Sequence, residues 1–259
     1  MNIQNRVKIK VIGIALPIAL LIVWHVFVSA GYVSPHILPL PETVLSTLVR
    51  LLTKGKLILM IAISLRRVVY GFLLGTASGF LLGLLMGLSR TAEKLFAPTF
   101  HTIRQVPLIG WIPLIVMWFG MNEVSRILVV AIGAFYPTTL NTFAGVRGVP
   151  RKYVELASVY GYKGLKLVRR IILPAALPSI ITGFTLSLGM SWVLLVAAEL
   201  LIETMAGIGK VIDIGRETFN MELVMVGIVT TGLLGFIMTK VVERAAQAAQ
   251  KGRVFEQEQ

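Results

Sequence analysis

Residues 154–174 read VELASVYGYKGLKLVRRIILP, a charged and glycine-containing interval between two long apolar stretches of the chain. Gly161 supplies the backbone freedom that a sharp turn requires, and the basic residues from Lys163 onward recur at three-residue steps on one helix face. Pro174 suits the first turn of a helix, where its missing N–H costs nothing. We therefore predict a short helix, a turn and a second helix; a plain solvated loop is the alternative.

The composition around this interval is that of a membrane protein. Of the 259 residues, 56% are hydrophobic and only 14% are charged, and the mean hydropathy is +0.84. Soluble domains carry roughly 25% charged residues, so we predict an all-α membrane protein. The chain contains no cysteine, which excludes disulfides, thiolate metal sites and thiol nucleophiles.

The apolar stretches predict about six transmembrane helices, since about 20 apolar residues are needed to cross a bilayer. The second stretch is too long for one upright span, so we expect its start at the outer surface. The third is short and is broken by Pro107 and Pro113. The predicted spans cover residues 11–30, 57–88, 106–119, 124–144, 175–201 and 223–242.

Between the first two spans we expect an amphipathic helix on the outer surface, because Val44, Leu48 and Leu51 recur at helical spacing. The expected organisation is a first span with this periplasmic segment (1–56), a core transmembrane domain (57–245) that contains the charged loop (146–174), and a cytoplasmic tail (246–259). The first span also resembles a secretory signal ending at Ala30, and cleavage there would leave five spans.

The net charge of +13 is mostly a signal of membrane topology. Cytoplasmic segments are enriched in Lys and Arg, and an orientation with both termini inside places 17 of the 25 basic residues in inner segments. We therefore predict an N-in and C-in topology, and no nucleic acid is needed to explain the charge. The inner basic residues are Arg6, Lys8, Lys10, Arg90, Lys94, Arg104, Arg147, Arg151, Lys152, Lys163, Lys166, Arg169, Arg170, Lys240, Arg244, Lys251 and Arg253.

Glycine recurs at every fourth residue through the second predicted span. Residues four apart share one helix face, and a stripe of small residues allows two membrane helices to approach closely. A static packing seam is the favoured interpretation, and a surface on which helices or subunits slide is the alternative. The glycines are Gly71, Gly75, Gly79, Gly83 and Gly87.

At the charged interval the chain resembles the permease subunits of bacterial ATP-binding-cassette importers, of the binding-protein-dependent type I family. The signature of that family reads Glu-Ala-Ala, three residues, Gly, nine residues, then Ile-x-Leu-Pro, and residues 155–157, 161 and 171–174 match every interval. Leu156, in place of the first Ala, is the one departure. The strings ILPLPETV (37–44), RQVPLIGWIPLIVMWFG (104–120) and VAAELLIETMAGIG (196–209) extend the resemblance to the branch that imports sulfonates, taurine, nitrate and bicarbonate.

This resemblance implies a type I importer fold in the plasma (inner) membrane, whose signature loop forms a coupling helix that docks on a separate cytoplasmic ATPase. The implied assembly has two permease copies, two ATPases that hold ATP and Mg²⁺, and a periplasmic or lipid-anchored solute-binding protein. No cofactor is expected in this chain. The residues carried over to the coupling contact are Glu155, Leu156, Ala157, Tyr160, Gly161, Tyr162 and Pro174.

The chain is not expected to be an enzyme. Its nearest string to a phosphate-binding loop, TMAGIGKV (204–211), has Thr204 where the first Gly belongs and Val211 where Ser or Thr belongs. No cluster of carboxylates and histidines indicates a metal site. A membrane-embedded enzyme and an ion-coupled secondary transporter are the alternatives, but convergent catalytic groups and clear internal repeats with mid-membrane charges are not visible.

Candidates for the solute path come from polar and aromatic groups in or near the spans. Ionisable residues inside a membrane are functional hypotheses by default, and Glu199 either lines the cavity or pairs with Arg66 or Arg67. The solute itself is left open, with small organic or inorganic anions favoured over a neutral heterocycle. The predicted path residues are Arg66, Arg67, Met117, Trp118, Ser191, Trp192 and Glu199. The alternatives are snorkelling of the two arginines to the interface, interfacial anchoring at 117–118, core packing at 191–192, and an interfacial charge at 199.

Overall fold

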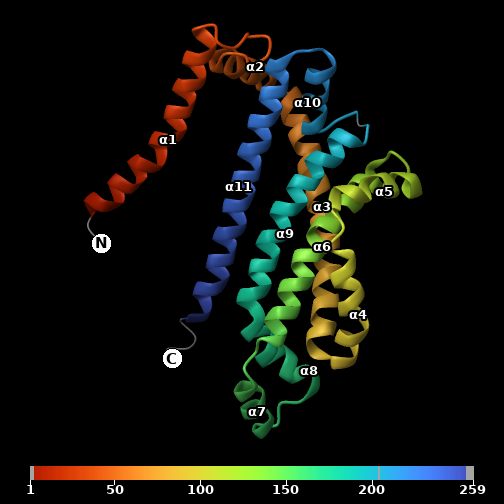
Figure 1. The fold of residues 1–259 in the computed structure, drawn as a ribbon. Helices are drawn as coiled ribbons and strands as arrows, with labels where there is room; N and C mark the ends of the chain where they lie inside the picture. Colours follow the sequence, from red (N-terminus) through yellow and green to blue (C-terminus); the bar gives the residue numbers. More distant parts are fainter. Residues whose placement is uncertain (1–2, 204, 255–259) are drawn as a thin grey trace.

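The structure is a computed structural model that describes residues 3–203 and 205–254, with side chains described for 15–203 and 205–244. The described chain is helical with short connections, and its long helices run side by side as a bundle (Figure 1). Within the described residues, four helices are long and apolar enough to cross a membrane. They are α3 (Lys56–Leu88), α6 (Glu123–Arg147), α9 (Leu173–Leu201) together with the turns before it, and α11 (Met221–Val254).

The third predicted span, residues 106–119, is wrong as a single span. Its place is taken by α4 (Arg90–Ile103), the 3₁₀ turn η1 (Leu108–Trp111) and α5 (Ile112–Phe119), and the two arms of this pair meet at 93°. Pro107 and Pro113 interrupt the helical hydrogen bonds at this bend. α4 lies against the lower half of the bundle, and α5 extends away from it (Figure 1). Counting the bent pair as one span gives five.

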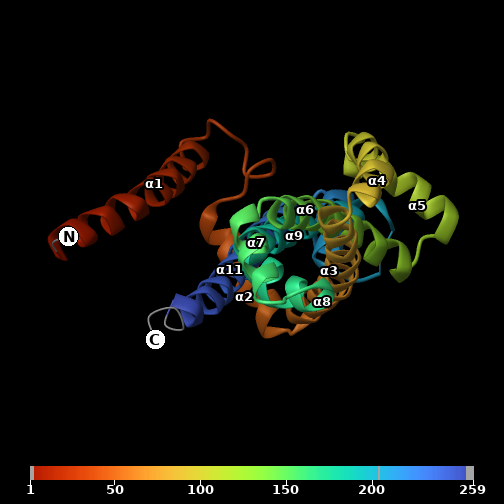
Figure 2. The same ribbon diagram turned by 90° about the horizontal axis from the view of Figure 1, so that it is seen from below.

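The first predicted span, 11–30, coincides with α1 (Ile3–Ser29) up to its last residue, and the part of α1 with described side chains, from Ala15 on, is apolar and mostly exposed. α1 diverges from the other helices in both views (Figures 1 and 2). It connects to α2 (Pro41–Thr53), where the Trp24 indole N–H donates to the Pro39 carbonyl at 3.0 Å. Val44 and Thr47 of α2 are buried against the bundle, so the amphipathic segment packs on the core.

The glycine stripe of α3 faces α6 of the same chain. A Cβ added at Gly75 would lie 2.1 Å from the Ala131 carbonyl oxygen, and one at Gly83 would lie 2.6 Å from that of Thr139. Gly71, Gly79 and Gly87 meet α6 equally closely. The stripe therefore lies in a packing seam inside one subunit.

α6 packs on its other side against α9, which joins the three helices into the core. The hydroxyls of Thr138 and Ser187 lie 2.7 Å apart in this interface, and both are fully buried. The Ser191 hydroxyl donates to the Val130 carbonyl at 3.1 Å. These bonds satisfy polar groups that lipid would leave unpaired.

The two ends of the bundle carry different short helices. α7 (Arg151–Val159) and α8 (Gly164–Leu167) lie at one end, and α2 and α10 (Ile208–Glu217) lie at the other (Figure 1). α1 begins and α11 ends toward the side of α7, in agreement with termini on one side of the membrane. The α7 end is called the inner end, following the charge rule, and the opposite end the outer end. The side chains of Arg6, Lys8, Lys10, Lys251 and Arg253, and tail residues 255–259, lie outside the described part.

Candidate coupling and solute-path sites

The predicted helix–turn–helix occupies the inner end. α7 begins directly after Pro150 and ends at a turn in which Gly161 has a φ of +76°. In that turn the Tyr162 N–H donates to the Ala157 carbonyl at 2.9 Å, which is the pattern that closes a helix with a left-handed glycine. A side chain at position 161 would be strained by this backbone angle.

α7 buries one side and exposes the other. Ala157 is 4% exposed and anchors the helix, whereas Leu156, Val159 and Tyr160 are 57%, 83% and 73% exposed. The Glu155 side chain is also exposed. An apolar surface of this kind at a solvent-facing helix is typical of a protein-binding site.

Tyr160 and Tyr162, which sequence reasoning treated alike, have different environments. Tyr160 points to the exposed surface, while the ring of Tyr162 lies 4.7 Å from the Lys166 ammonium and its hydroxyl accepts from Arg170 at 3.5 Å. Tyr162 thus stiffens the link between α7 and the following helix.

Pro174 lies in the first turn of α9, as the sequence predicts. It lies within a continuous helical segment from Gly164 to Leu201, directly after the π-helical turn η2 (Val168–Ile172). A proline inside a helix lacks an N–H and displaces the carbonyl four residues before it. The wider π turn accommodates this displacement, because its hydrogen bonds span five residues.

At the outer end, Glu199 is buried in an ion-pair network that we call the Glu199 cluster: Ser64, Arg67, Glu123, Arg126 and Glu199. The Arg67 guanidinium donates a hydrogen bond to Glu199 Oε1 at 2.7 Å and one to each carboxylate oxygen of Glu123. Arg67 and Glu199 are 2% and 1% exposed. Arg67, rather than Arg66, is therefore the partner of Glu199.

The loop after α9 closes over the Glu199 cluster. The Gly209 N–H donates to Glu199 Oε2 at 2.9 Å, and the Ile208 N–H donates to the Ser64 hydroxyl at 2.9 Å. The carboxylate thus lies at the N-terminus of α10, where the helix dipole favours negative charge. A Cβ at Gly207 would lie 2.5 Å from Glu199 Oε1, so only glycine fits there.

Several members of this network were not among the predicted site residues. Ser64 comes from α3, whereas Glu123 and Arg126 come from the first turn of α6, and Arg126 reaches the carbonyl of Glu203. The available signal was the GIG triplet after Glu199, whose glycines permit the close approach of backbone to carboxylate. The triplet alone does not identify the residues that it contacts, because these depend on which helices pack beside it in the fold.

The remaining path candidates fall into two groups. Ser191 and Trp192 are buried, and the Trp192 indole N–H donates to the Thr231 carbonyl at 3.1 Å. They hold α9 against its neighbours. Met117 and Trp118 are 72% and 63% exposed on α5, and Arg66 is exposed on α3.

Comparison with known proteins identifies the family of this chain. The family model described as "Binding-protein-dependent transport system inner membrane component" matches residues 79–251. The chain belongs to this family. Its long apolar helices and this membership make it a multi-pass membrane permease of ABC importers with a type I permease fold.

Individual relatives of this permease are similar along most of their length. A putative aliphatic sulfonates transport permease protein, SsuC of Bacillus subtilis, is 40% identical over 86% of this chain and 80% of its own. The bicarbonate transport system permease protein CmpB of Synechococcus elongatus is 30% identical over 90% and 88%. Among solved structures, the inward-facing MetNI methionine ABC transporter has a TM-score of 0.62 at 18% identity, covering 76% of this permease and 97% of that chain.

Proposed function

We propose that this permease forms the membrane path of an ATP-driven importer for a small anion, and that a separate cytoplasmic ATPase drives it through α7. The supporting observation is the exposed apolar face of α7, which lies at the end opposite the buried Glu199 cluster. Contact with the ATPase would cover Leu156, Val159 and Tyr160, whose exposure to water is otherwise unfavourable.

The assembly that fits this proposal contains two copies of the permease, two ATPases with ATP and Mg²⁺, and a binding protein that delivers the solute. A homodimer is the common closed arrangement of identical subunits. The string at 204–211 lacks the residues of a phosphate-binding loop, which supports placing ATP on the partner.

An anion is the favoured solute class. The relatives named above are described as permeases for aliphatic sulfonates and for bicarbonate. Both solutes carry one negative charge and few atoms. A small monovalent anion therefore accounts for both descriptions.

The test uses the permease reconstituted in proteoliposomes with its ATPase and binding protein. We expect ATP-dependent uptake of a short alkanesulfonate or of bicarbonate, and ATPase activity that rises when the loaded binding protein is added. Gly161→Val should abolish uptake, because a branched residue at a φ of +76° distorts the turn of the coupling helix.

The matched control is Gly31→Val. Gly31 has a φ of +78° and, like Gly161, has no heavy atom within 4 Å of an added Cβ, but it follows α1 at the outer end. Both variants should be equally strained, and only Gly161→Val should lose uptake. Normal uptake by Gly161→Val with its ATPase assembled would refute the coupling role. Uptake driven by an ion gradient without ATP would instead favour a secondary transporter.

A further inference from the structure

α4 carries a row of basic side chains that lies on one face. Arg90, Lys94, His101 and Arg104 are separated by four, seven and three residues, with Ala97 in the gap. At about 100° per residue these positions fall within roughly 40° on either side of one line. We call them the α4 basic row.

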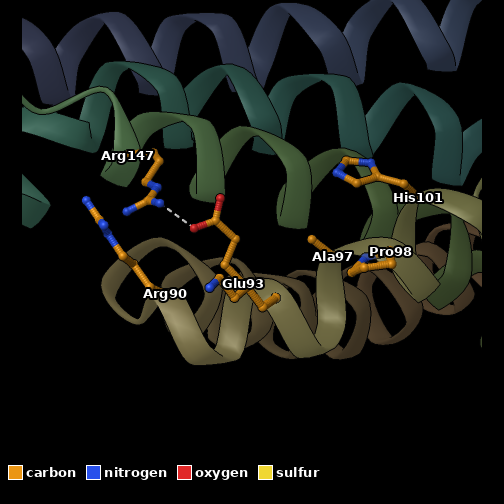
Figure 3. A pocket seen from close by; sticks show the side chains of 7 residues that line it. Arg90, Glu93, Ala97, Pro98, His101 and Arg147 are labelled. Atoms are coloured by element: carbon orange, nitrogen blue, oxygen red, sulfur yellow. Dashed lines mark hydrogen bonds and ion pairs between the residues drawn. The ribbon is translucent and has the colours of Figure 1, made fainter.

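The lower part of the row lines a cavity of about 490 Å³ between α4 and α6, near the inner end. Figure 3 shows Arg90 and His101 on the side of α4 that faces α6, with Arg147 of α6 opposite. Glu93 is paired with Arg147, whereas Arg90 and Lys94 have no ion pair among the described residues. The cavity therefore retains a net positive charge.

The upper part of the row opens into a second cavity, of about 590 Å³, at the bend after α4. Arg104 lies at its wall with Gln105, Tyr136 and Asn141, and Leu186 and Met190 of α9 supply an apolar side. Arg104 is exposed and has no acidic partner in the described part of the chain. A cation beside polar groups and an apolar wall suits a small anion with a short hydrocarbon part.

The topology rule explains the lower basic residues but not Arg104. Arg90 and Lys94 belong to the inner end, where basic residues are common. Arg104 follows 14 residues later along α4, which is about 21 Å of helix rise and brings it well into the bilayer. The sequence analysis placed Arg104 among the inner charges, and this helix rise would put it deeper than that. A charged residue at this depth without a partner indicates a functional site.

Arg67, whose role is structural, provides a comparison for the exposure and the carboxylate partners of Arg104. It is 2% exposed and bound by two carboxylates. Arg104 differs in both respects, since it is exposed to a cavity and has no carboxylate beside it.

We infer that Arg104 binds the transported anion at the middle of the membrane, and that the lower members of the α4 basic row line its exit to the cytoplasm. The inference rests on the proposed import function and adds the site and the charge of the solute. The ligand class is a small monoanion, such as a short alkanesulfonate or bicarbonate.

The absence of cysteine allows a direct test in the full permease assembled with its ATPase. Met190→Cys places one thiol in the cavity of Arg104. We would measure its rates of labelling by the anionic reagent 2-sulfonatoethyl methanethiosulfonate and by the cationic 2-(trimethylammonium)ethyl methanethiosulfonate. The ratio of anionic to cationic rate should fall roughly tenfold when Arg104→Gln is added, since one charge at short range changes the local concentrations of anion and cation by about threefold each, in opposite directions.

Three comparisons make the result specific. Arg104→Lys should restore the ratio, and excess butanesulfonate should slow labelling only where Arg104 or Lys is present. Leu45→Cys, on the exposed face of α2, should show a ratio that Arg104→Gln does not change. Arg50→Gln removes an exposed positive charge of α2 and should leave the ratio at Met190→Cys unchanged.

Labelling and transport can fail separately. An unchanged ratio at Met190→Cys after Arg104→Gln would overturn the anion site even in a working importer. A changed ratio without protection by butanesulfonate would also overturn it, and would point to a lipid phosphate at Arg104. If labelling behaves as expected but uptake of butanesulfonate by the assembled transporter does not need ATP, the site stands and the proposed energy source fails.

Discussion

The two ends of this permease differ in which side chains are buried within the chain and which are exposed. At the outer end, Arg67, Arg126 and Glu199 of the Glu199 cluster are buried and bonded within the chain, and the loop after α9 is closed over Glu199. At the inner end, α7 buries Ala157 but exposes Leu156, Val159 and Tyr160. The buried charges of the outer end are satisfied within the chain, whereas the apolar side chains of α7 at the inner end are left without a partner among the described residues.

The difference indicates how force can pass through the molecule. If a partner drives α7, as proposed above, the continuous helical segment Gly164–Leu201 connects the inner end with the Glu199 cluster. The ion pairs and hydrogen bonds of the Glu199 cluster connect α9 with α3 and α6, so the three helices are held together at the outer end of α9. Breaking one end should therefore affect stability, and breaking the other should affect partner binding.

The largest effect is expected from Glu199→Gln. Removing one partner of a buried ion pair typically costs about 3–5 kcal/mol, because it leaves the other charge uncompensated. Thermal unfolding in detergent should show this loss as a markedly lower melting temperature. Glu155→Gln, at an exposed carboxylate of α7, is the matched control and should melt like the wild type. Equal melting of both variants would remove the contrast between the two ends.

The next effect concerns the seam that connects the two ends. Gly75→Ala places a methyl group 2.1 Å from the Ala131 carbonyl oxygen, and overpacking of this kind costs about 1–3 kcal/mol or more. Gly232→Ala, on α11 with no atom within 4 Å, should instead be neutral or raise stability by up to about 1 kcal/mol. The melting temperature should therefore fall for Gly75→Ala and not for Gly232→Ala, and an equal fall in both would contradict the seam.

These features differ in how far the sequence predicted them. The glycine period is readable because its four-residue spacing places all five residues on one face whatever the neighbour is. The turn at Gly161 is readable for a similar local reason. The sequence does not show whether Arg66 or Arg67 pairs with Glu199. Adjacent residues of a helix point about 100° apart, so the rotation of α3 in the bundle decides which arginine faces α9.

The bent pair α4–α5 shows a second limit. α4 alternates basic and apolar groups, so its hydropathy is low and a search for apolar spans begins only after it. The spacing of Arg90, Lys94, His101 and Arg104 was a usable signal of a helix face. It was interpreted only as inner charge, because nothing in the sequence places α4 alongside α6.

A smaller effect is expected at the exposed face of α7. Leu156→Ala and Tyr160→Ala should each weaken binding of the ATPase by about 1–2 kcal/mol, as is usual for apolar residues near the centre of an interface. Titration of the purified ATPase onto the permease in nanodiscs would measure this as a roughly 5- to 30-fold increase in Kd. The control is Leu81→Ala, 65% exposed on α3, which should leave Kd unchanged. Unchanged Kd for both α7 variants would assign the apolar face to another partner.

The smallest effect tests whether burial, rather than the presence of an ion pair, makes the outer end rigid. Asp213 of α10, whose side chain is 14% exposed, pairs with Lys210 at 3.1 Å and with the exposed Arg216 at 2.7 Å, near the protein surface. The hydrogen bond from Lys210 lowers the pKa of the Asp213 carboxyl below its ordinary value of 3.8. Surface pairs contribute only about 0.2–1 kcal/mol, so Asp213→Asn should barely change melting at neutral pH.

The sign of the pH dependence follows from that lowered pKa. The contribution of Asp213 is present above the pKa of the unfolded chain and is lost as the pH falls through the lower pKa of the folded state. The melting curves of wild type and Asp213→Asn should therefore converge in acid, and high salt should also reduce their difference. A loss at neutral pH as large as that of Glu199→Gln would show that pairing alone, without burial, sets the stability of the outer end.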